Sequence, residues 1–288
     1  MEKKHTDSAV IALDPVLLWP SGAPGAAGSG PEDCPRLTPF LPKTRKPVGA
    51  VVVCPGGGYH VRAAHEREPI ARWVAGGGLA GFLLDYRVAP YRHPVPLSDA
   101  QRAIRLVRSR AKEWNVLPDK IAILGFSAGG HLAVSAATVF DAGKPDAADS
   151  IDRQSCRPDA LIACYPVVTF GEFRHDGSMR NLLGQEVDER LRQYLSLENR
   201  VTAQTPPTFL WHTGDDEGVP VENSLLLAAA LRRCRVPVAL HVFPHGQHGL
   251  GLAGDHPTAR AWTGLCAEWL AEIGFRAGAR DAKRIIGE

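Results

Sequence analysis

The chain has 288 residues, of which 44% are hydrophobic, and its formal net charge is +2. This length and apolar content predict one large α/β domain with a substantial core instead of two small domains. The densest basic groups, residues 43–46 and 102–110, are interpreted as a loop and a solvated helix face, so the sequence indicates no nucleic-acid partner.

The start of the chain predicts neither a secretion signal nor a membrane span. The apolar run from Val10 to Leu18 is interrupted by Asp14 and Pro15. We therefore expect a cytoplasmic protein with no membrane partner. The six cysteines are widely spaced and form no CxxC pair, which predicts reduced thiols and no cysteine metal site.

Strands and helices are predicted to alternate after an N-terminal arm. Residues 1–47 should form this arm, packed on the core, and the many glycines and prolines of residues 20–47 predict irregular structure there. Strands are predicted at Ala50–Cys54, Gly81–Asp85, Lys120–Leu124, Ala160–Tyr165, Thr208–His212 and Val238–Phe243. Helices are predicted around Glu66–Ala75, Leu97–Trp114, Ala128–Phe140, Val221–Cys234 and Thr258–Ile273. The alternation predicts an α/β fold in which a mostly parallel sheet has helices on both faces. One catalytic domain should cover residues 48–275, and a charged tail should follow at 276–288.

One connection is too long for a simple crossover. About forty residues, 166–206, separate the strand ending at Tyr165 from the next strand, and they include a predicted helix around Asp188–Leu195. We interpret them as a short, lid-like insertion above the carboxyl edge of the sheet, where open α/β sheets bind ligands. Bulky residues in the insertion, Phe170, Phe173 and Met179, are expected to close the acyl side of a pocket there.

The sequence Gly125-Phe126-Ser127-Ala128-Gly129 lies between a predicted strand and a predicted helix. A G-x-S-x-G in this context is a nucleophile elbow, a turn so sharp that the serine takes a strained backbone conformation and only small neighbours fit. The alternative is a plain glycine-rich turn between strand and helix. The context favours Ser127 as a nucleophile aimed at an acyl carbon.

A serine hydroxyl needs a base and a carboxylate to orient that base. Asp215, Asp216 and Glu217 follow the strand that ends at His212, and the spacing before Val219-Pro220 favours Asp216 as the acid. The simpler interpretation of the three acidic residues is a solvated turn.

The base is expected after the last predicted strand. His248, between Gly246 and Gly249, is favoured, while His241 and His245 are interpreted as structural. A zinc site made of these three histidines lacks a carboxylate partner and leaves Ser127 unexplained.

The glycine run Cys54-Pro55-Gly56-Gly57-Gly58-Tyr59 follows the first predicted core strand. Backbone amides without a neighbouring Cβ can approach the negative oxygen that develops during acyl transfer. We expect the amides of Gly57, Gly58 and Ala128 to form this oxyanion hole. A dinucleotide site is disfavoured, because Val61 stands where G-x-G-x-x-G requires its last glycine.

Two further groups are predicted to support the site without reacting. His131 lies one helical turn after Ser127 and should be a buried, hydrogen-bonded histidine that supports the elbow. Arg87 and Asp99, with Tyr86, are expected to brace the oxyanion loop.

Taken together, these segments resemble the α/β-hydrolases, and more narrowly the bacterial acetyl-xylan-esterase-like group of esterases and lipases. The resemblance extends over most of the chain and rests on segments in the family's order: LWP with GAPG near residue 20, PGGGY, DYRVAP, GFSAGGHLA, NLLG, PPTFLWHTGDD with VPVENSL, and GQHGLGL. It implies the α/β-hydrolase fold, with Ser127 as nucleophile, Asp216 as acid and His248 as base. The chain departs from the HGGG loop of lipases, because Cys54-Pro55 replaces the histidine, and this weakens the transfer of lipase substrate preferences.

We therefore predict a serine esterase that needs neither cofactor nor metal and removes short acyl groups, chiefly acetyl, from a small-molecule ester such as an acetylated carbohydrate. Two alternatives stay open at this point. An amidase or peptidase would use the same triad, and a catalytically silent hydrolase fold would serve only for binding. The sequence leaves the oligomeric state open.

Overall fold

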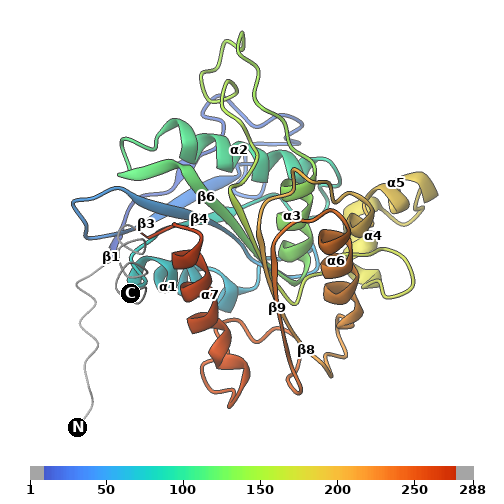
Figure 1. Ribbon diagram of the computed structural model, residues 1–288. Coiled ribbons are helices and arrows are strands. Elements are labelled where there is room, and N and C mark those ends of the chain that lie inside the picture. The colour runs from blue at the N-terminus through green and yellow to red at the C-terminus, as the bar shows by residue number, and fades with distance from the viewer. Residues whose placement is uncertain (1–9, 277–288) are drawn as a thin grey trace, which may run out of the picture.

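The computed structural model describes residues 10–276 and contains one mixed sheet covered by helices on both faces (Figure 1). The strands are β1 (Val10–Ala12), β2 (Val16–Leu17), β3 (Arg36–Pro42), β4 (Val48–Cys54), β5 (Ala80–Asp85), β6 (Val116–Phe126), β7 (Ala160–Cys164), β8 (Thr208–Thr213) and β9 (Val238–Phe243). The α-helices are α1 (Glu68–Gly76), α2 (Val95–Ser109), α3 (Ser127–Thr138), α4 (Asp176–Leu183), α5 (Glu189–Tyr194), α6 (Glu222–Arg233) and α7 (Trp262–Glu272). Short 3₁₀ turns lie at Ala64–Glu66, Leu197–Asn199 and Ala259–Ala261.

The strand order is β1-β3-β5-β4-β6-β7-β8-β9, with β2 also paired to β3. From β5 to β9 all neighbours are parallel, whereas β3 is antiparallel to β5, β1 and β2. The predicted α/β fold with a mostly parallel sheet is confirmed. The six predicted strands are present, each within a few residues of its expected bounds.

Central strands are apolar on both faces because helices cover both faces. Every residue of β4 is buried, and its side chains alternate between two cores. Val52 and Cys54 pack with residues of α2, α3 and α6, whereas Val51 and Val53 pack with residues of α1 and α7. Figure 1 shows these helices on the two sides of the sheet.

One part of the predicted N-terminal arm differs from the sequence prediction. Residues 36–42, expected to be irregular, form β3 and continue the sheet beyond β5. Half-buried and buried residues alternate from Arg36 to Pro39, as in a strand. The prolines are tolerated because β3 pairs with antiparallel neighbours near the edge of the sheet. The first nine residues of the predicted arm lie outside the described part of the chain, as does the predicted tail except for Arg276.

The basic face of α2 is not the solvated surface expected from the sequence. Arg102 and Arg105 are buried, and their guanidinium groups pair with aspartates of the long loop between α3 and β7. Asp149 and Asp152 bind Arg102, and Asp141 binds Arg105. These cations therefore hold a loop in place.

Among residues 10–276, no helix is long and apolar enough to cross a membrane. All six cysteines are free thiols, and Cys54 and Cys164 lie buried in β4 and β7. The glycines at 76–78 end α1 and carry the chain into the next turn.

Candidate active site

Ser127 stands at the point where β6 ends and α3 begins, and its φ angle of 52° is in the left-handed region that residues with a Cβ rarely adopt. The two glycines of the elbow are required by close packing. A Cβ on Gly125 would lie 2.0 Å from the carbonyl oxygen of Gly129. A Cβ on Gly129 would lie 2.3 Å from the carbonyl oxygen of Cys54 in β4. Small residues therefore let α3 start directly against the sheet, with Ser127 at its first turn.

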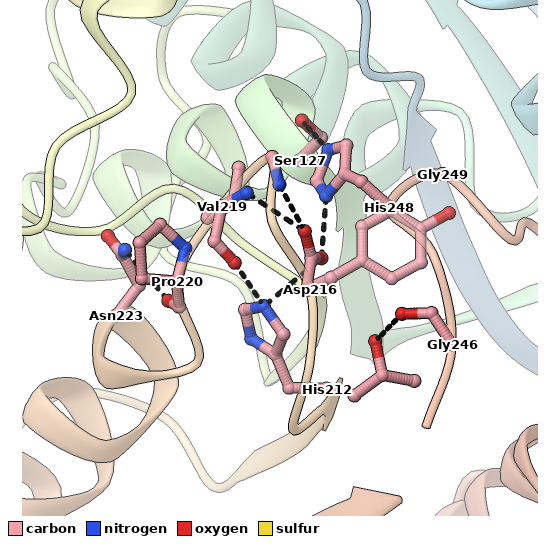
Figure 2. A network of polar contacts seen from close by, with 12 residues as sticks. Ser127, His212, Asp216, Val219, Pro220, Asn223, Gly246, His248 and Gly249 are labelled. Atoms are coloured by element: carbon pink, nitrogen blue, oxygen red, sulfur yellow. Dashed lines mark hydrogen bonds and ion pairs between the residues drawn. The ribbon is translucent and has the colours of Figure 1, made fainter. Parts of the chain in front are cut away.

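Three predicted site residues come from the carboxyl ends of three strands and meet in one hydrogen-bonded chain, here called the candidate triad: Ser127, His248 and Asp216. His248 Nε2 lies 2.8 Å from Ser127 Oγ, and His248 Nδ1 lies 2.7 Å from Asp216 Oδ2 (Figure 2). A carboxylate only accepts hydrogen bonds, so Nδ1 carries the proton and Nε2 is free to accept the serine proton. This is the tautomer that a general base requires.

The Asp216 carboxylate is anchored on every side. Its Oδ1 accepts hydrogen bonds from the amides of Gly218 and Val219, each at 2.9 Å, and His212 Nε2 lies 3.5 Å from Oδ2. Burial by itself raises the pKa of Asp216, but the hydrogen bonds from His212, His248 and the Val219 amide outweigh it and hold the pKa well below its usual range. Asp216 is therefore ionised and fixed in direction toward the imidazole.

His212 is the member of this group that the sequence analysis did not assign to the site. It is fully buried at the end of β8, where its Nε2–H donates to the Val219 carbonyl at 2.9 Å and its Nδ1 accepts from Ser224 Oγ at 2.7 Å. The signal was present in the sequence: a histidine among the apolar residues of a buried strand must find polar partners inside the protein.

The oxyanion loop, residues 54–59, runs beside the elbow. Gly57 and Gly58 line a pocket of about 210 Å³ together with Ser127 and His248. Among the described residues, the amides of Gly57 and Gly58 donate to no acceptor, and the amide of Ala128 in the first turn of α3 has no intrahelical acceptor. The three expected donors are thus gathered around the serine with free N–H groups.

Glu66 is a buried carboxylate behind this loop, and no feature of the sequence had pointed to it. Its two oxygens accept from the amide of Gly56 and from the hydroxyl of Tyr165, each at 2.7 Å. The same hydroxyl accepts from the amide of Gly251 at 2.7 Å, in the loop that carries His248. Glu66 therefore links the oxyanion loop to the histidine loop. The helix predicted to start at this residue begins two residues later, at Glu68.

His131 is buried below the elbow, as expected, and joins α3 to the insertion. Its Nε2–H donates to the carbonyl of Leu195 at 3.0 Å, its Nδ1 accepts from the hydroxyl of Tyr59 at 2.9 Å, and its ring stacks on Phe170 at 4.5 Å. Burial lowers the pKa of His131 to about 4. Of the predicted brace, Tyr86 contacts the oxyanion loop, because its hydroxyl donates to the carbonyl of Pro55 at 2.7 Å. Arg87 and Asp99 form a buried ion pair, and Arg87 also donates to the carbonyl of Pro24 in the N-terminal arm.

The insertion, residues 166–206, does not close the pocket with bulky side chains as predicted. Phe170 and Met179 are buried in the core instead of closing the pocket, and among the described residues of the insertion only His175 lines it. The reason is α4, a helix that the sequence analysis did not predict, which brings Asn181 to the oxyanion loop. Asn181 Nδ2 donates to the carbonyl of Gly58 at 2.8 Å, so the insertion supports the loop.

The other two histidines of the last loop region are separated from the triad. His245 Nδ1 lies 2.9 Å from Asp215 Oδ2 on the surface, and His241 lies on β9 with its ring 5.0 Å from that of Phe209. Among the described residues, no group of three or more histidine, cysteine, aspartate or glutamate side chains is arranged to hold a metal ion.

Comparisons with known proteins agree with this architecture. The sequence profile of the BD-FAE family matches residues 39–231. The chain is 40% identical over 225 residues to endo-1,4-beta-xylanase B of Butyrivibrio fibrisolvens, covering 77% of this chain and 35% of that protein. It is 34% identical over 223 residues to an acetylxylan esterase of Xylanibacter ruminicola, covering 75% of this chain and 44% of that protein. The chain thus spans between a third and a half of the length of these two relatives.

A solved structure resembles the whole described domain. The acetyl ester-xyloside bifunctional hydrolase of Caldicellulosiruptor lactoaceticus superposes with a TM-score of 0.87 at 49% identity, covering 91% of this chain and 97% of that one. The fold, the family profile and the similar proteins all indicate the same family. The described domain is a carboxylic ester hydrolase with the α/β-hydrolase fold, and the chain belongs to the BD-FAE family, in its acetyl-xylan-esterase-like group.

Proposed function

We propose that this protein is a serine carboxylesterase that removes acetyl and other short acyl groups from an alcohol carrying further hydroxyl groups, such as an acetylated xylo-oligosaccharide. The observation that carries the proposal is the continuous hydrogen-bonded chain from Asp216 through His248 to Ser127. The names of the similar proteins, an acetylxylan esterase and an acetyl ester-xyloside hydrolase, support the substrate class.

In the first half-reaction, Ser127 Oγ attacks the ester carbonyl carbon while His248 Nε2 takes the hydroxyl proton. The carbonyl oxygen becomes negative and receives hydrogen bonds from the amides of Gly57, Gly58 and Ala128. The C–O bond to the alcohol then breaks, and His248 returns its proton to the leaving alcohol oxygen. The product is an acyl ester of Ser127.

In the second half-reaction, water repeats the attack on the acyl carbon, with His248 again accepting the proton. Collapse of the second tetrahedral intermediate releases the carboxylic acid and restores the Ser127 hydroxyl. Asp216 stays ionised throughout and stabilises the imidazolium that forms twice per turnover. Both half-reactions balance without a cofactor.

The pocket size supports short acyl groups. Its volume of about 210 Å³ is below the roughly 300–1,000 Å³ typical of pockets that enclose drug-sized ligands. Such a pocket can enclose an acetyl group next to Ser127, and the alcohol then extends toward solvent.

The test is a comparison of kcat/KM for acetylated xylose and xylobiose, p-nitrophenyl acetate and p-nitroacetanilide, with Ser127→Ala as control. We expect turnover of the esters, slow or no turnover of the anilide, and a loss of at least about a thousandfold in kcat for Ser127→Ala. Preference for the anilide would identify an amidase. No turnover of any substrate, or near-normal turnover by Ser127→Ala, would contradict the proposal.

A further inference from the structure

His175 is the side chain that the insertion contributes to the serine pocket. It is half-buried just before α4, and it shares the pocket with Ser127 and His248. The mechanism given above does not use it. Its hydrogen bonds fix both its ring orientation and the position of its proton.

The Nδ1 atom of His175 caps α4. It accepts a hydrogen bond from the backbone amide of Ser178 at 3.1 Å, and the hydroxyl of Ser178 lies 2.8 Å from the same atom. An imidazole nitrogen that accepts an amide N–H carries no proton itself, so the proton of the neutral ring is on Nε2. Burial and the nearby His248 both lower the pKa of His175, which keeps the ring neutral at neutral pH.

The Nε2–H group of His175 has no acceptor among the described residues, although its ring borders the pocket. A donor that is oriented by a helix cap and left unpaired in a substrate pocket is suited to bind a substrate oxygen. The oxyanion already has three backbone amides. His175 lies near His248, the group that protonates the leaving alcohol, so the oxygen within its reach belongs to the alcohol.

We propose that His175 is a specificity-determining residue that donates its Nε2–H to a hydroxyl oxygen on the carbon adjacent to the esterified carbon of the alcohol. This inference rests on the proposed esterase function and specifies its substrate class: monoacylated vicinal diols, of which partly acetylated sugars are examples. An alcohol without the neighbouring hydroxyl leaves the donor unpaired and binds the transition state less tightly.

The test uses two esters that differ by one hydroxyl group, trans-2-hydroxycyclohexyl acetate and cyclohexyl acetate. The measured quantity is the ratio of their kcat/KM values for wild type and variants. His175→Asn keeps an oxygen at the place of Nδ1 for the Ser178 amide but removes the Nε2–H. His175→Gln places an amide N–H near the position of Nε2 but loses the cap. The matched control is His245→Asn, a surface histidine that lies outside the serine pocket.

We expect His175→Asn to lower the ratio about five- to tenfold relative to wild type, the size of one hydrogen bond. His175→Gln should retain part of the ratio despite a lower Tm, and His245→Asn should keep the wild-type ratio. An unchanged ratio in His175→Asn, or an equal loss for both esters, would overturn the role of His175 while leaving the esterase function intact. Failure of wild type on both esters would overturn the proposed function itself.

Discussion

Two aspartate–histidine pairs connect the same two loops of this protein, and only one of them is built like part of an active site. The loop after β8 supplies Asp215 and Asp216, and the loop after β9 supplies His245 and His248. The distances are similar, 2.9 Å for Asp215–His245 and 2.7 Å for Asp216–His248. The side chains of the first pair are 52% and 83% exposed, and those of the second are 1% and 27% exposed.

We infer from this difference that a carboxylate–imidazole contact alone does not make a catalytic pair. Asp216 has lost its water and is held instead by two backbone amides and His212, so its charge and direction are fixed. Asp215 is largely exposed and accepts one backbone hydrogen bond, from the amide of Gly246, and an exposed ion pair of this kind contributes little free energy. The buried pair also has Ser127 at its other end. Burial, anchoring and a third partner distinguish the two pairs.

The largest expected effect comes from neutralising each aspartate in turn. Asp216→Asn should lower kcat by about 10⁴, because the amide cannot hold the imidazole in the required tautomer, whereas Asp215→Asn should stay within about threefold of wild type. Steady-state kinetics on p-nitrophenyl acetate measure both. The reverse ranking would mean that the solvent-exposed pair is the functional one.

Varying the length of the acyl chain tests the size of the pocket next to Ser127. Because this pocket is small, about 210 Å³, we expect kcat/KM on p-nitrophenyl esters to be highest at acetyl or propionyl. It should fall by about a hundredfold at octanoyl. In an open apolar groove each added methylene would instead contribute roughly 0.8 kcal/mol of binding. A profile that rises with chain length would show a lipase-like groove and exclude a deacetylase.

Burial also determines whether a histidine makes the stability of the protein depend on pH. The pKa of the buried His131 is about 4, below its ordinary value near 6.5. Between pH 6.5 and 4 the unfolded chain therefore binds a proton that the folded chain does not, so stability falls as the pH is lowered through this window. One group shifted this far accounts for about 3 kcal/mol.

Urea unfolding at several pH values between 4 and 7 measures this effect. His131→Gln should lose most of this slope, while the exposed His245→Gln should retain it. Parallel pH profiles for wild type and His131→Gln would mean that another group is responsible.

The smallest expected effect concerns the insertion. Asn181→Ala removes the hydrogen bond to the carbonyl of Gly58, and we expect kcat on p-nitrophenyl acetate to fall about tenfold as the oxyanion loop loses this support. The neighbouring exposed residue offers a control, Arg180→Ala, which should have little effect. Equal activity of the two variants would show that the loop is positioned without Asn181.

The parts of the fold that follow local sequence patterns were predictable. Apolar runs such as Val51-Val52-Val53 predict buried strands, and glycines around Ser127 predict the sharp turn between β6 and α3. The strand β3 was missed because its prolines suggest irregular structure, and only its antiparallel neighbours at the sheet edge make a strand possible. The helix α4 was missed because its polar sequence is stabilised by a cap and by packing that the sequence does not specify.

The same limit holds at the site. Chain order and spacing were enough to select Ser127, Asp216 and His248, since each follows a predicted strand. The supporting residues Glu66 and Asn181 each have a partner far away in the sequence: Glu66 accepts from the hydroxyl of Tyr165, and Asn181 donates to the carbonyl of Gly58. A hydrogen bond between distant segments depends on the folded arrangement and leaves no local pattern. Their roles therefore became visible only in three dimensions.

The central claim is that Ser127 forms the acyl-enzyme, and trapping it with a serine-reactive organophosphonate tests this most directly. The labelled protein is digested, and mass spectrometry identifies the modified peptide in wild type, Asp215→Asn and Ser127→Ala. We predict one adduct per chain, on Ser127, in wild type and Asp215→Asn, with loss of esterase activity in proportion to labelling, and no adduct in Ser127→Ala. A stoichiometric adduct on another residue, or full activity after complete labelling of Ser127, would contradict the account.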